Sequence, residues 1–139
     1  MTIDGKKIAQ KILESLHPAK KLRLAGVLVG QNPELKKFIE LKKKAAEGIG
    51  IGFQSYEFPE DISNDELEEE LNKIAKAKTN SGVIIELPLP RHLNTQDLLN
   101  IIPEEKDVDV LSQESQDDFF VGRSKVLPPA VEAVKQIFE

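Results

Sequence analysis

A short apolar run that stops at two prolines limits the folds open to this sequence. Residues 82–90 read Gly-Val-Ile-Ile-Glu-Leu-Pro-Leu-Pro. The β-branched run has strand length, and Pro88 and Pro90 cannot donate hydrogen bonds to a sheet. The pattern predicts a buried strand that carries Glu86 to its carboxyl edge, where ligands bind in open α/β sheets. The segment alone is equally compatible with an ordinary strand followed by a stiff loop.

Strand-like and helix-like segments alternate along the chain. Strands are predicted at 24–29, 53–58 and 83–85, with a fourth strand end at 106–110, and helices at 8–16, 33–49, 64–75, 95–102 and 129–137. An acidic, polar loop is expected before the last helix. Pro18 ends the first helix, Gly50 closes the second, and Ser63 caps the third. Such alternation predicts parallel βαβ units in a three-layer α/β/α fold, with a small, mainly parallel sheet of about four strands.

Composition argues against several classes of function. The 139 residues fit one domain with a substantial core. A net charge of −5, from 19 basic and 24 acidic residues, argues against nucleic-acid binding. Cysteine is absent, and His17 and His92 lack zinc-like spacing, so we expect no metal. Neither a signal peptide nor a membrane-length apolar run is seen, so we expect a soluble, cytoplasmic protein with no membrane contact.

Three segments are expected to bring polar side chains to one cleft. Phe38 and Lys42 are four residues apart and share one face of the second helix. Glu86 follows the third strand, and Asp107 and Asp109 lie at the fourth. The carboxyl ends of parallel strands meet at one edge of a sheet, so these groups should surround one cleft. A lysine beside carboxylates can transfer protons or form a plain surface ion pair, and spacing leaves both readings open.

Five short motifs resemble one enzyme family. They are Ile-Asp-Gly-Lys-Lys-Ile-Ala at 3–9, Leu-Val-Gly-Gln-Asn-Pro at 28–33, Lys-Lys-Lys-Ala at 42–45, the run at 82–90, and residues 103–109 with Lys-Asp-Val-Asp. In this order and spacing they resemble the N-terminal catalytic domain of the bifunctional methylenetetrahydrofolate dehydrogenase/methenyltetrahydrofolate cyclohydrolase family. The resemblance runs from Ile3 to about Gly122, and this type of domain is amino-acid-dehydrogenase-like in architecture.

The resemblance implies a tetrahydrofolate cleft on a catalytic domain formed by residues 1–139. It also implies an NAD(P)-binding Rossmann domain, which we expect to be absent from this chain. The parent enzyme would oxidise 5,10-methylenetetrahydrofolate to 5,10-methenyltetrahydrofolate with NAD or NADP, and would hydrolyse that product to 10-formyltetrahydrofolate. Family members commonly pair through the absent domain, so the parent is expected to be a homodimer and the isolated domain a monomer.

The resemblance also assigns roles to single residues. Lys42 matches the catalytic lysine, which activates water or relays a proton, and Glu86 matches a glutamine that tunes this lysine. Asp109 matches the aspartate that holds the pterin ring of folate. Leu87 and Pro88 would line the slot for that ring.

Three positions depart from the family pattern. Phe38 stands where tyrosine is usual, which removes a hydroxyl but keeps a ring that can stack on folate. Glu86 replaces glutamine, and a carboxylate favours the ammonium form of Lys42, a poorer base. Val110 replaces a glycine. These departures motivate an alternative, a folate-binding or regulatory module with impaired catalysis. A substrate domain with another ligand would share the same architecture.

Glycines elsewhere do not predict a dinucleotide site. Gly48, Gly50 and Gly52 come after a helix and before a strand, the reverse of the order that a dinucleotide-binding turn requires. Residues 121–124, Val-Gly-Arg-Ser, resemble a phosphate loop but lack a preceding buried strand. We therefore expect no cofactor-binding residues in this chain.

Overall fold

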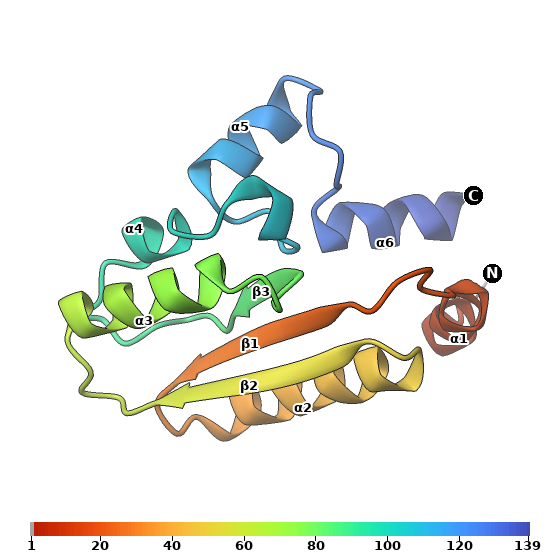
Figure 1. The fold of residues 1–139 in the computed structure, drawn as a ribbon. Helices are drawn as coiled ribbons and strands as arrows, with labels where there is room; N and C mark the ends of the chain where they lie inside the picture. The colour runs from red at the N-terminus through yellow and green to blue at the C-terminus, as the bar shows by residue number, and fades with distance from the viewer. Residues whose placement is uncertain (1) are drawn as a thin grey trace.

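A three-stranded parallel sheet lies at the centre of the computed structural model, which describes residues 2–139 (Figure 1). Strand β1 (Arg23–Val29) lies between β2 (Gly52–Phe58) and β3 (Gly82–Ile85), and both pairs run parallel. The helices are α1 (Gly5–Ser15), α2 (Pro33–Gly48), α3 (Asn64–Lys76), α4 (Thr95–Leu99), α5 (Gln113–Phe120) and α6 (Pro129–Phe138), with a 3-10 turn at Glu104–Lys106. The predicted α/β fold with parallel βαβ units is confirmed.

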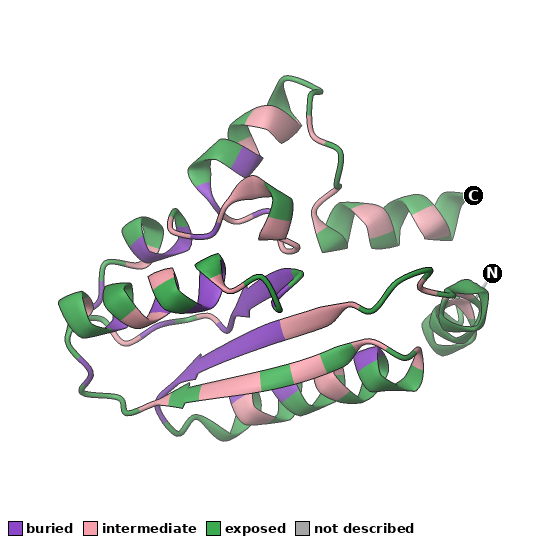
Figure 2. Ribbon diagram, viewed as in Figure 1, coloured by how far each residue is buried: buried purple, intermediate pink, exposed green. Residues whose placement is uncertain are grey.

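Helices cover both faces of the sheet, which gives the three predicted layers (Figures 1 and 2). On one face, Val27 of β1 belongs to a core cluster with Leu67 of α3. On the other face, Leu28 packs with Leu35 and Ile39 of α2. Successive strand residues point to opposite faces, so β1 supplies both cores. Val27, Leu28 and Leu67 are all 0% exposed, and burying each such side chain contributes about 1.5–3 kcal/mol.

Gly26 lets α2 approach the centre of the sheet closely. A Cβ atom at this position would lie 2.6 Å from Cζ of Phe53 and 2.9 Å from Cδ1 of Ile39. Both distances are shorter than carbon atoms tolerate, so any larger residue would push α2 or β2 away. The close packing of α2 against the sheet therefore depends on the absence of a side chain at Gly26.

The boundaries of α2 and α3 follow local signals in the sequence. Asn32 caps α2 by accepting from the backbone N–H of Glu34 at 2.9 Å, and Pro33 occupies the first turn. The predicted cap Ser63 forms a reciprocal capping box with Glu66 at the start of α3. After α2, Gly50 adopts a φ of +81°, in the region that glycine reaches without strain.

The fourth strand was predicted wrongly. Residues 106–110 make only a single parallel bridge to the sheet, between Val83 and Asp107. The backbone N–H groups of Lys106, Val108 and Val110 donate instead to carbonyls two or three residues earlier. These tight turns satisfy the backbone locally, so the segment cannot continue along β3 as a ladder.

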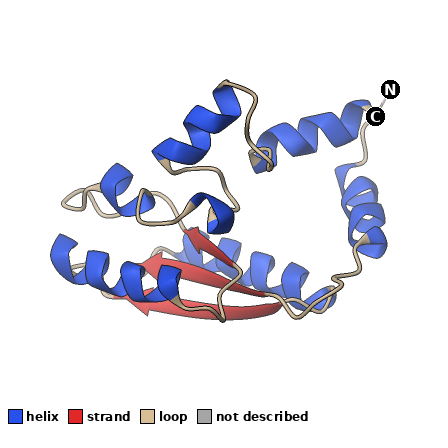
Figure 3. Cartoon of the chain, turned by 45° about the horizontal axis from the view of Figure 1, so that its top comes forward, coloured by secondary structure: helices blue, strands red, loops and turns tan. Residues whose placement is uncertain are grey.

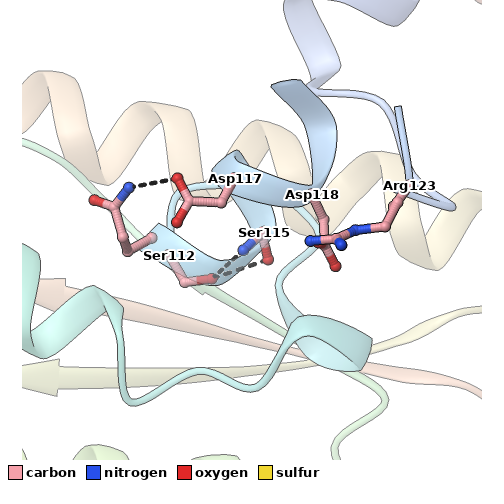
Figure 4. Close-up of polar contacts among 6 residues, drawn as sticks. Ser112, Ser115, Asp117, Asp118 and Arg123 are labelled. Atoms are coloured by element: carbon pink, nitrogen blue, oxygen red, sulfur yellow. Dashed lines mark hydrogen bonds and ion pairs between the residues drawn. The ribbon is translucent and has the colours of Figure 1, made fainter. Parts of the chain in front are cut away.

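The expected acidic loop before the last helix is also wrong in part, because it contains α5 (Figure 4). Ser112 caps this helix, and its hydroxyl oxygen accepts from the backbone N–H of Ser115 at 3.2 Å. The Ser112 hydroxyl also donates to the Ser115 hydroxyl at 2.9 Å, and both serines are 2% exposed. At the far end, Asp118 accepts from the guanidinium of Arg123 at 2.8 Å. Polar side chains therefore hold both ends of α5.

Helices α1 and α6 lie at the same end of the molecule, beside the two termini (Figures 1 and 3). Neither helix has a buried residue. The apolar side chains Val131, Val134 and Ile137 of α6 are exposed, as is Leu13 of α1. Among residues 2–139, no helix combines the length and apolar character needed to cross a bilayer.

The close approach at Gly26 generates a stability prediction. Gly26→Ala should lower the free energy of unfolding by about 1–3 kcal/mol, because the new methyl group overpacks the contact with Phe53 and Ile39. Gly48→Ala is the matched control, since a Cβ there meets nothing within 4 Å. Alanine in a helix is favoured over glycine by about 0.5–1 kcal/mol, so this variant should be as stable as the parent or more so. Urea denaturation measures both, and equal effects would contradict the assigned packing.

Candidate active site at the end of strand β3

Glu86 extends β3 by one residue and then faces the end of the sheet. Its backbone N–H donates to the carbonyl of Val27 at 2.9 Å, so the parallel ladder runs one residue beyond Ile85. The chain then turns away through a cis peptide bond between Leu87 and Pro88. Glu86 is 5% exposed, so its carboxylate is almost fully removed from water. A carboxylate buried in this way needs a positively charged or hydrogen-bonding partner.

Lys42 of α2 provides that partner. Its Nζ lies 2.8 Å from Oε1 of Glu86, as both a hydrogen bond and an ion pair. The Lys42 side chain is 38% exposed and that of Glu86 only 6%. One end of the pair therefore faces solvent while the other is enclosed by protein. A bound molecule would meet the lysine first.

Asp109 completes a group of three charged side chains. Burial raises the pKa of the Asp109 carboxyl, the positive charge of Lys42 opposes this, and the negative charges of Glu86 and Asp107 add to it. Asp109 therefore lies within electrostatic reach of the whole Lys42 and Glu86 pair. Among the described residues, the ion pair of Lys42 is with Glu86 and not with Asp109. Asp109 thus keeps acceptor capacity for another group.

Lys106 and Asp107 hold the backbone on which Asp109 sits. Nζ of Lys106 donates to the carbonyls of Ala75 at 2.7 Å and Ala77 at 3.0 Å, at the C-terminal end of α3. The Asp107 carboxylate accepts from the backbone N–H groups of two later residues, Leu111 at 3.0 Å and Ser112 at 2.8 Å. Sequence reasoning grouped Asp107 with Asp109 as a site residue, but its carboxylate is committed to the start of α5.

Val108 and Val110 flank Asp109 with unusual packing. A Cβ on Gly82 would lie 2.7 Å from Cγ1 of Val108, so the glycine at the start of β3 allows this segment to lie against the sheet. Val110 has a φ of 56°, in the left-handed region that β-branched residues rarely adopt. The family resemblance implies a glycine at this position, and a positive φ is a conformation that glycine adopts without strain.

The remaining predicted residues are dispersed around this group. Phe38 lies one turn before Lys42 on α2 and is 52% exposed, so its ring is available beside the lysine. Leu87 is half-buried and packs against the main core. Pro88 is exposed and lines a neighbouring cleft. The structure brings Lys42 and Glu86 into contact, places Asp109 within electrostatic reach of both, and puts Pro88 on the neighbouring cleft.

The neighbouring cleft was not anticipated from the sequence. Its volume is about 1410 Å³, and it lies where β1 and β3 end. Its polar lining includes Gln31 and Asn32 from the turn before α2, and Arg91 and His92 from the turn after β3. The turn before α2 includes the end of the motif at 28–33, and Arg91 and His92 directly follow the run at 82–90. The rule that carboxyl ends of parallel strands share one edge would have predicted their proximity.

The described residues do not fit a dinucleotide. Binding one requires a strand, a turn with glycines spaced G-x-G-x-x-G, and a helix. The turn from β1 to α2 carries the single glycine Gly30, whereas Gly50 lies between α2 and β2 and Gly52 begins β2. Residues 2–139 also contain no group of three or more His, Cys, Asp or Glu side chains arranged to hold a metal ion.

The two aspartates generate opposite stability predictions. A raised pKa means that Asp109 favours folding below the ordinary carboxyl pKa, and that this contribution is lost as pH rises through the raised value. Asp109→Asn should therefore raise the melting temperature at pH 7, and the gain should shrink as pH falls into the ordinary carboxyl range. Asp107→Asn should instead cost about 1–3 kcal/mol, because two backbone N–H groups lose a charged acceptor. Thermal melts from pH 3 to 7 would contradict this account if both variants shifted in the same direction.

Comparison with known proteins connects this geometry to a family. Residues 3–109 match the family described as tetrahydrofolate dehydrogenase/cyclohydrolase, catalytic domain. The bifunctional protein FolD of Wolbachia sp. subsp. Drosophila simulans is 34% identical over 136 residues, which are 91% of this chain and 47% of that protein. FolD of Methanococcoides burtonii is 33% identical over 135 residues, again 91% and 47%. The chain spans about half the length of the curated relatives that it matches.

Solved structures agree with the sequence comparison. The bifunctional 5,10-methylenetetrahydrofolate dehydrogenase/cyclohydrolase from Thermoplasma acidophilum superposes with a TM-score of 0.89 at 29% identity, covering 96% of this chain and 50% of that one. The Campylobacter jejuni FolD enzyme gives a TM-score of 0.78 at 27% identity, covering 94% and 48%. The family match extends over more than half of the chain, and the predicted resemblance is confirmed: this chain belongs to the tetrahydrofolate dehydrogenase/cyclohydrolase catalytic-domain family.

Proposed function

We propose that this chain is the folate-binding catalytic domain of an enzyme that oxidises 5,10-methylenetetrahydrofolate to 5,10-methenyltetrahydrofolate with NAD(P), and then hydrolyses it to 10-formyltetrahydrofolate. The observation that carries the proposal is the Lys42 and Glu86 ion pair at 2.8 Å, with Asp109 beside it, in a domain of this family. A buried carboxylate, a partly exposed amine and a further carboxylate are the groups expected of a site for proton transfer.

Asp109 and Phe38 are suited to hold the pterin ring. The ring carries an amino group and an adjacent ring N–H, and a carboxylate can accept both in parallel. The exposed ring of Phe38 offers an apolar face against which a flat heterocycle can stack. Leu87, which follows Glu86 directly, would border the same slot, and Pro88 would form its edge on the side of the neighbouring cleft. Together these residues would orient the one-carbon bridge of folate towards Lys42.

Hydrolysis of the methenyl bridge requires the movement of protons at one carbon atom. Water adds its oxygen to the methenyl carbon and loses a proton, which converts the cationic bridge to a neutral carbinol. The bond from that carbon to N5 then breaks, N5 takes up a proton, and the hydroxyl loses its proton to become the formyl carbonyl on N10. The overall change consumes one water and releases one proton. A group beside the carbon must therefore accept a proton and return one.

Lys42 and Glu86 can perform this exchange as a pair. In its amine form Lys42 accepts a proton from the attacking water, and the Glu86 carboxylate, 2.8 Å away, stabilises the ammonium that forms. The resulting ammonium of Lys42 then donates its extra proton to N5 as the bond from carbon to N5 breaks. The 38% exposure of the Lys42 side chain allows contact with a bound molecule, while the buried Glu86 remains behind it.

The oxidation step uses NAD(P) as the hydride acceptor, and the described residues offer no fitting site for that group. The contribution of this chain to that step is therefore to bind and orient the folate. We further propose a cytoplasmic setting, with folate as the small-molecule partner and with neither nucleic acid nor membrane as a ligand. The intact enzyme would act as a homodimer, and this domain alone would be a monomer.

Substitution of the lysine tests the proposed function. Lys42→Met should lower the rate of methenyltetrahydrofolate hydrolysis by about 10²–10⁴-fold, since it removes the proton-transfer group. The circular dichroism spectrum at low temperature should be unchanged, because Lys42 is partly exposed on α2, whereas the melting temperature should fall, because the buried Glu86 carboxylate loses its partner. Lys43→Met, at the next position of the helix, is the matched control and should retain the parent rate.

Two outcomes would contradict the proposal. One is a parent protein that hydrolyses methenyltetrahydrofolate no faster than buffer does; if that protein still binds folate, the alternative of a binding module with impaired catalysis gains support. The other is an equal loss of rate in the Lys42 and Lys43 variants, which would remove the specific role of Lys42. The disappearance of the methenyl chromophore reports the rate in each case.

A further inference from the structure

The Asp107 carboxylate closes a short loop around Asp109. It accepts from the backbone N–H groups of Leu111 at 3.0 Å and Ser112 at 2.8 Å. Asp109 lies between Asp107 and these donors in the sequence, so it occupies the middle of the loop. The carbonyl of Asp107 also accepts from the backbone N–H of Val110 at 3.1 Å. One residue therefore holds the backbone after Asp109 through both its side chain and its main chain.

The loop is fixed to the rest of the protein at both ends. Asp107 is 6% exposed, and its backbone forms a parallel bridge with Val83 of β3. At the other end, its carboxylate binds the start of α5. Val110, within the loop, is 4% exposed and keeps a φ of 56°. A β-branched residue stays in this conformation only where the surrounding contacts enforce it, and the Asp107 hydrogen bonds are such contacts.

The Asp109 side chain has no support of its own. Within residues 2–139, neighbouring charges and burial act on its carboxylate, but no hydrogen bond or ion pair holds it. Its direction therefore follows from the backbone that carries it. A carboxylate whose backbone is fixed in advance loses less conformational freedom when it binds a ligand, and this increases affinity.

We propose that Asp107 is a positioning residue for folate, which acts through the backbone of Asp109 and does not itself contact the ligand. This inference rests on the proposed function, in which Asp109 holds the pterin ring. Lys42 lies on α2 and Glu86 at the end of β3, both outside the loop. Loss of the Asp107 contacts should therefore weaken folate binding more than it slows the chemical step.

Position and charge predict opposite effects of removing this carboxylate. The negative charge of Asp107 contributes to the raised pKa of Asp109, after burial. If Asp107 acted by charge alone, its removal would favour the charged form of Asp109 and strengthen folate binding. If it acts by position, its removal weakens folate binding. The direction of the change in affinity separates the two.

Asp107→Asn tests the proposal, because it keeps the shape and one acceptor oxygen but removes the charge that strengthens both hydrogen bonds. The dissociation constant of the purified protein for 5-formyltetrahydrofolate should rise about tenfold. The KM for methenyltetrahydrofolate hydrolysis should rise with it, while kcat stays within about threefold of the parent. In an Asp109→Ala background, Asp107→Asn should change the dissociation constant by less than about twofold, because no carboxylate remains to be positioned.

Two control variants separate positioning from general effects on charge and stability. Asp117→Asn makes the same change in net charge on α5, where the Asp117 carboxylate accepts from Gln113 (Figure 4). Ser63→Ala removes the cap of α3 and so destabilises the domain without altering the loop. Both should retain the parent affinity for 5-formyltetrahydrofolate when measured well below their melting temperatures.

A measurement on the unaltered protein provides an independent test. Coupling between two sites is reciprocal, so folate bound at Asp109 should stabilise the loop that Asp107 closes. Saturating 5-formyltetrahydrofolate should slow hydrogen exchange at the Leu111 and Ser112 amides by about fivefold, and should not do so in Asp109→Ala.

Three results would overturn the inference. The first is unchanged or tighter binding by folded Asp107→Asn, and the second is an equal loss of affinity in the Asp109→Ala background. The third is unchanged exchange at Leu111 and Ser112 in the folate complex. If the parent binds 5-formyltetrahydrofolate, each of these leaves the proposed function standing. A parent that does not bind it would contradict the proposed function and this inference together.

Discussion

The buried carboxylate of Glu86 is the constraint on which the site depends. An enclosed carboxylate without a partner would cost several kcal/mol, so a cation has to reach it. Lys42 does so only because α2 lies close against the sheet, and α2 lies there because Gly26 has no side chain. The parallel ladder, extended by the bond from Glu86 to Val27, fixes the other half of the pair. Packing at the centre of the sheet thereby sets a polar contact at its edge.

In the segment from Lys106 to Val110, neighbouring residues make different contacts. Lys106 binds the end of α3, Asp107 binds the start of α5, and Val108 rests on Gly82. These three contacts leave Asp109 as the residue whose carboxylate is free for a ligand beside Lys42. The strained backbone of Val110 follows immediately. The contacts of Lys106, Asp107 and Val108 therefore hold the Asp109 carboxylate in position.

Much of this arrangement was predictable from the sequence, for physical reasons. Apolar periodicity, prolines and caps identified the three strands and the helices α2 and α3, and the parallel-sheet rule brought Lys42, Glu86 and Asp109 to one edge. The fourth strand was not foreseen as a turn, because an alternating five-residue segment fits either a ladder or local hydrogen bonds. Helix α5 was missed because its composition is polar. The hydrogen bond between its cap, Ser112, and the Ser115 hydroxyl is seen only in the structure. The structural role of Asp107 likewise depends on contacts that spacing does not reveal.

A crystal structure of this protein with 5-formyltetrahydrofolate would test the central claim most directly, because it locates the folate without requiring turnover. The account predicts the pterin amino group and ring N–H within hydrogen-bond distance of the Asp109 carboxylate, with the ring beside Phe38 and the one-carbon group facing Lys42. A ligand seated instead in the cleft between Gln31 and Arg91, with the Lys42 and Glu86 pair left open to solvent, would contradict it.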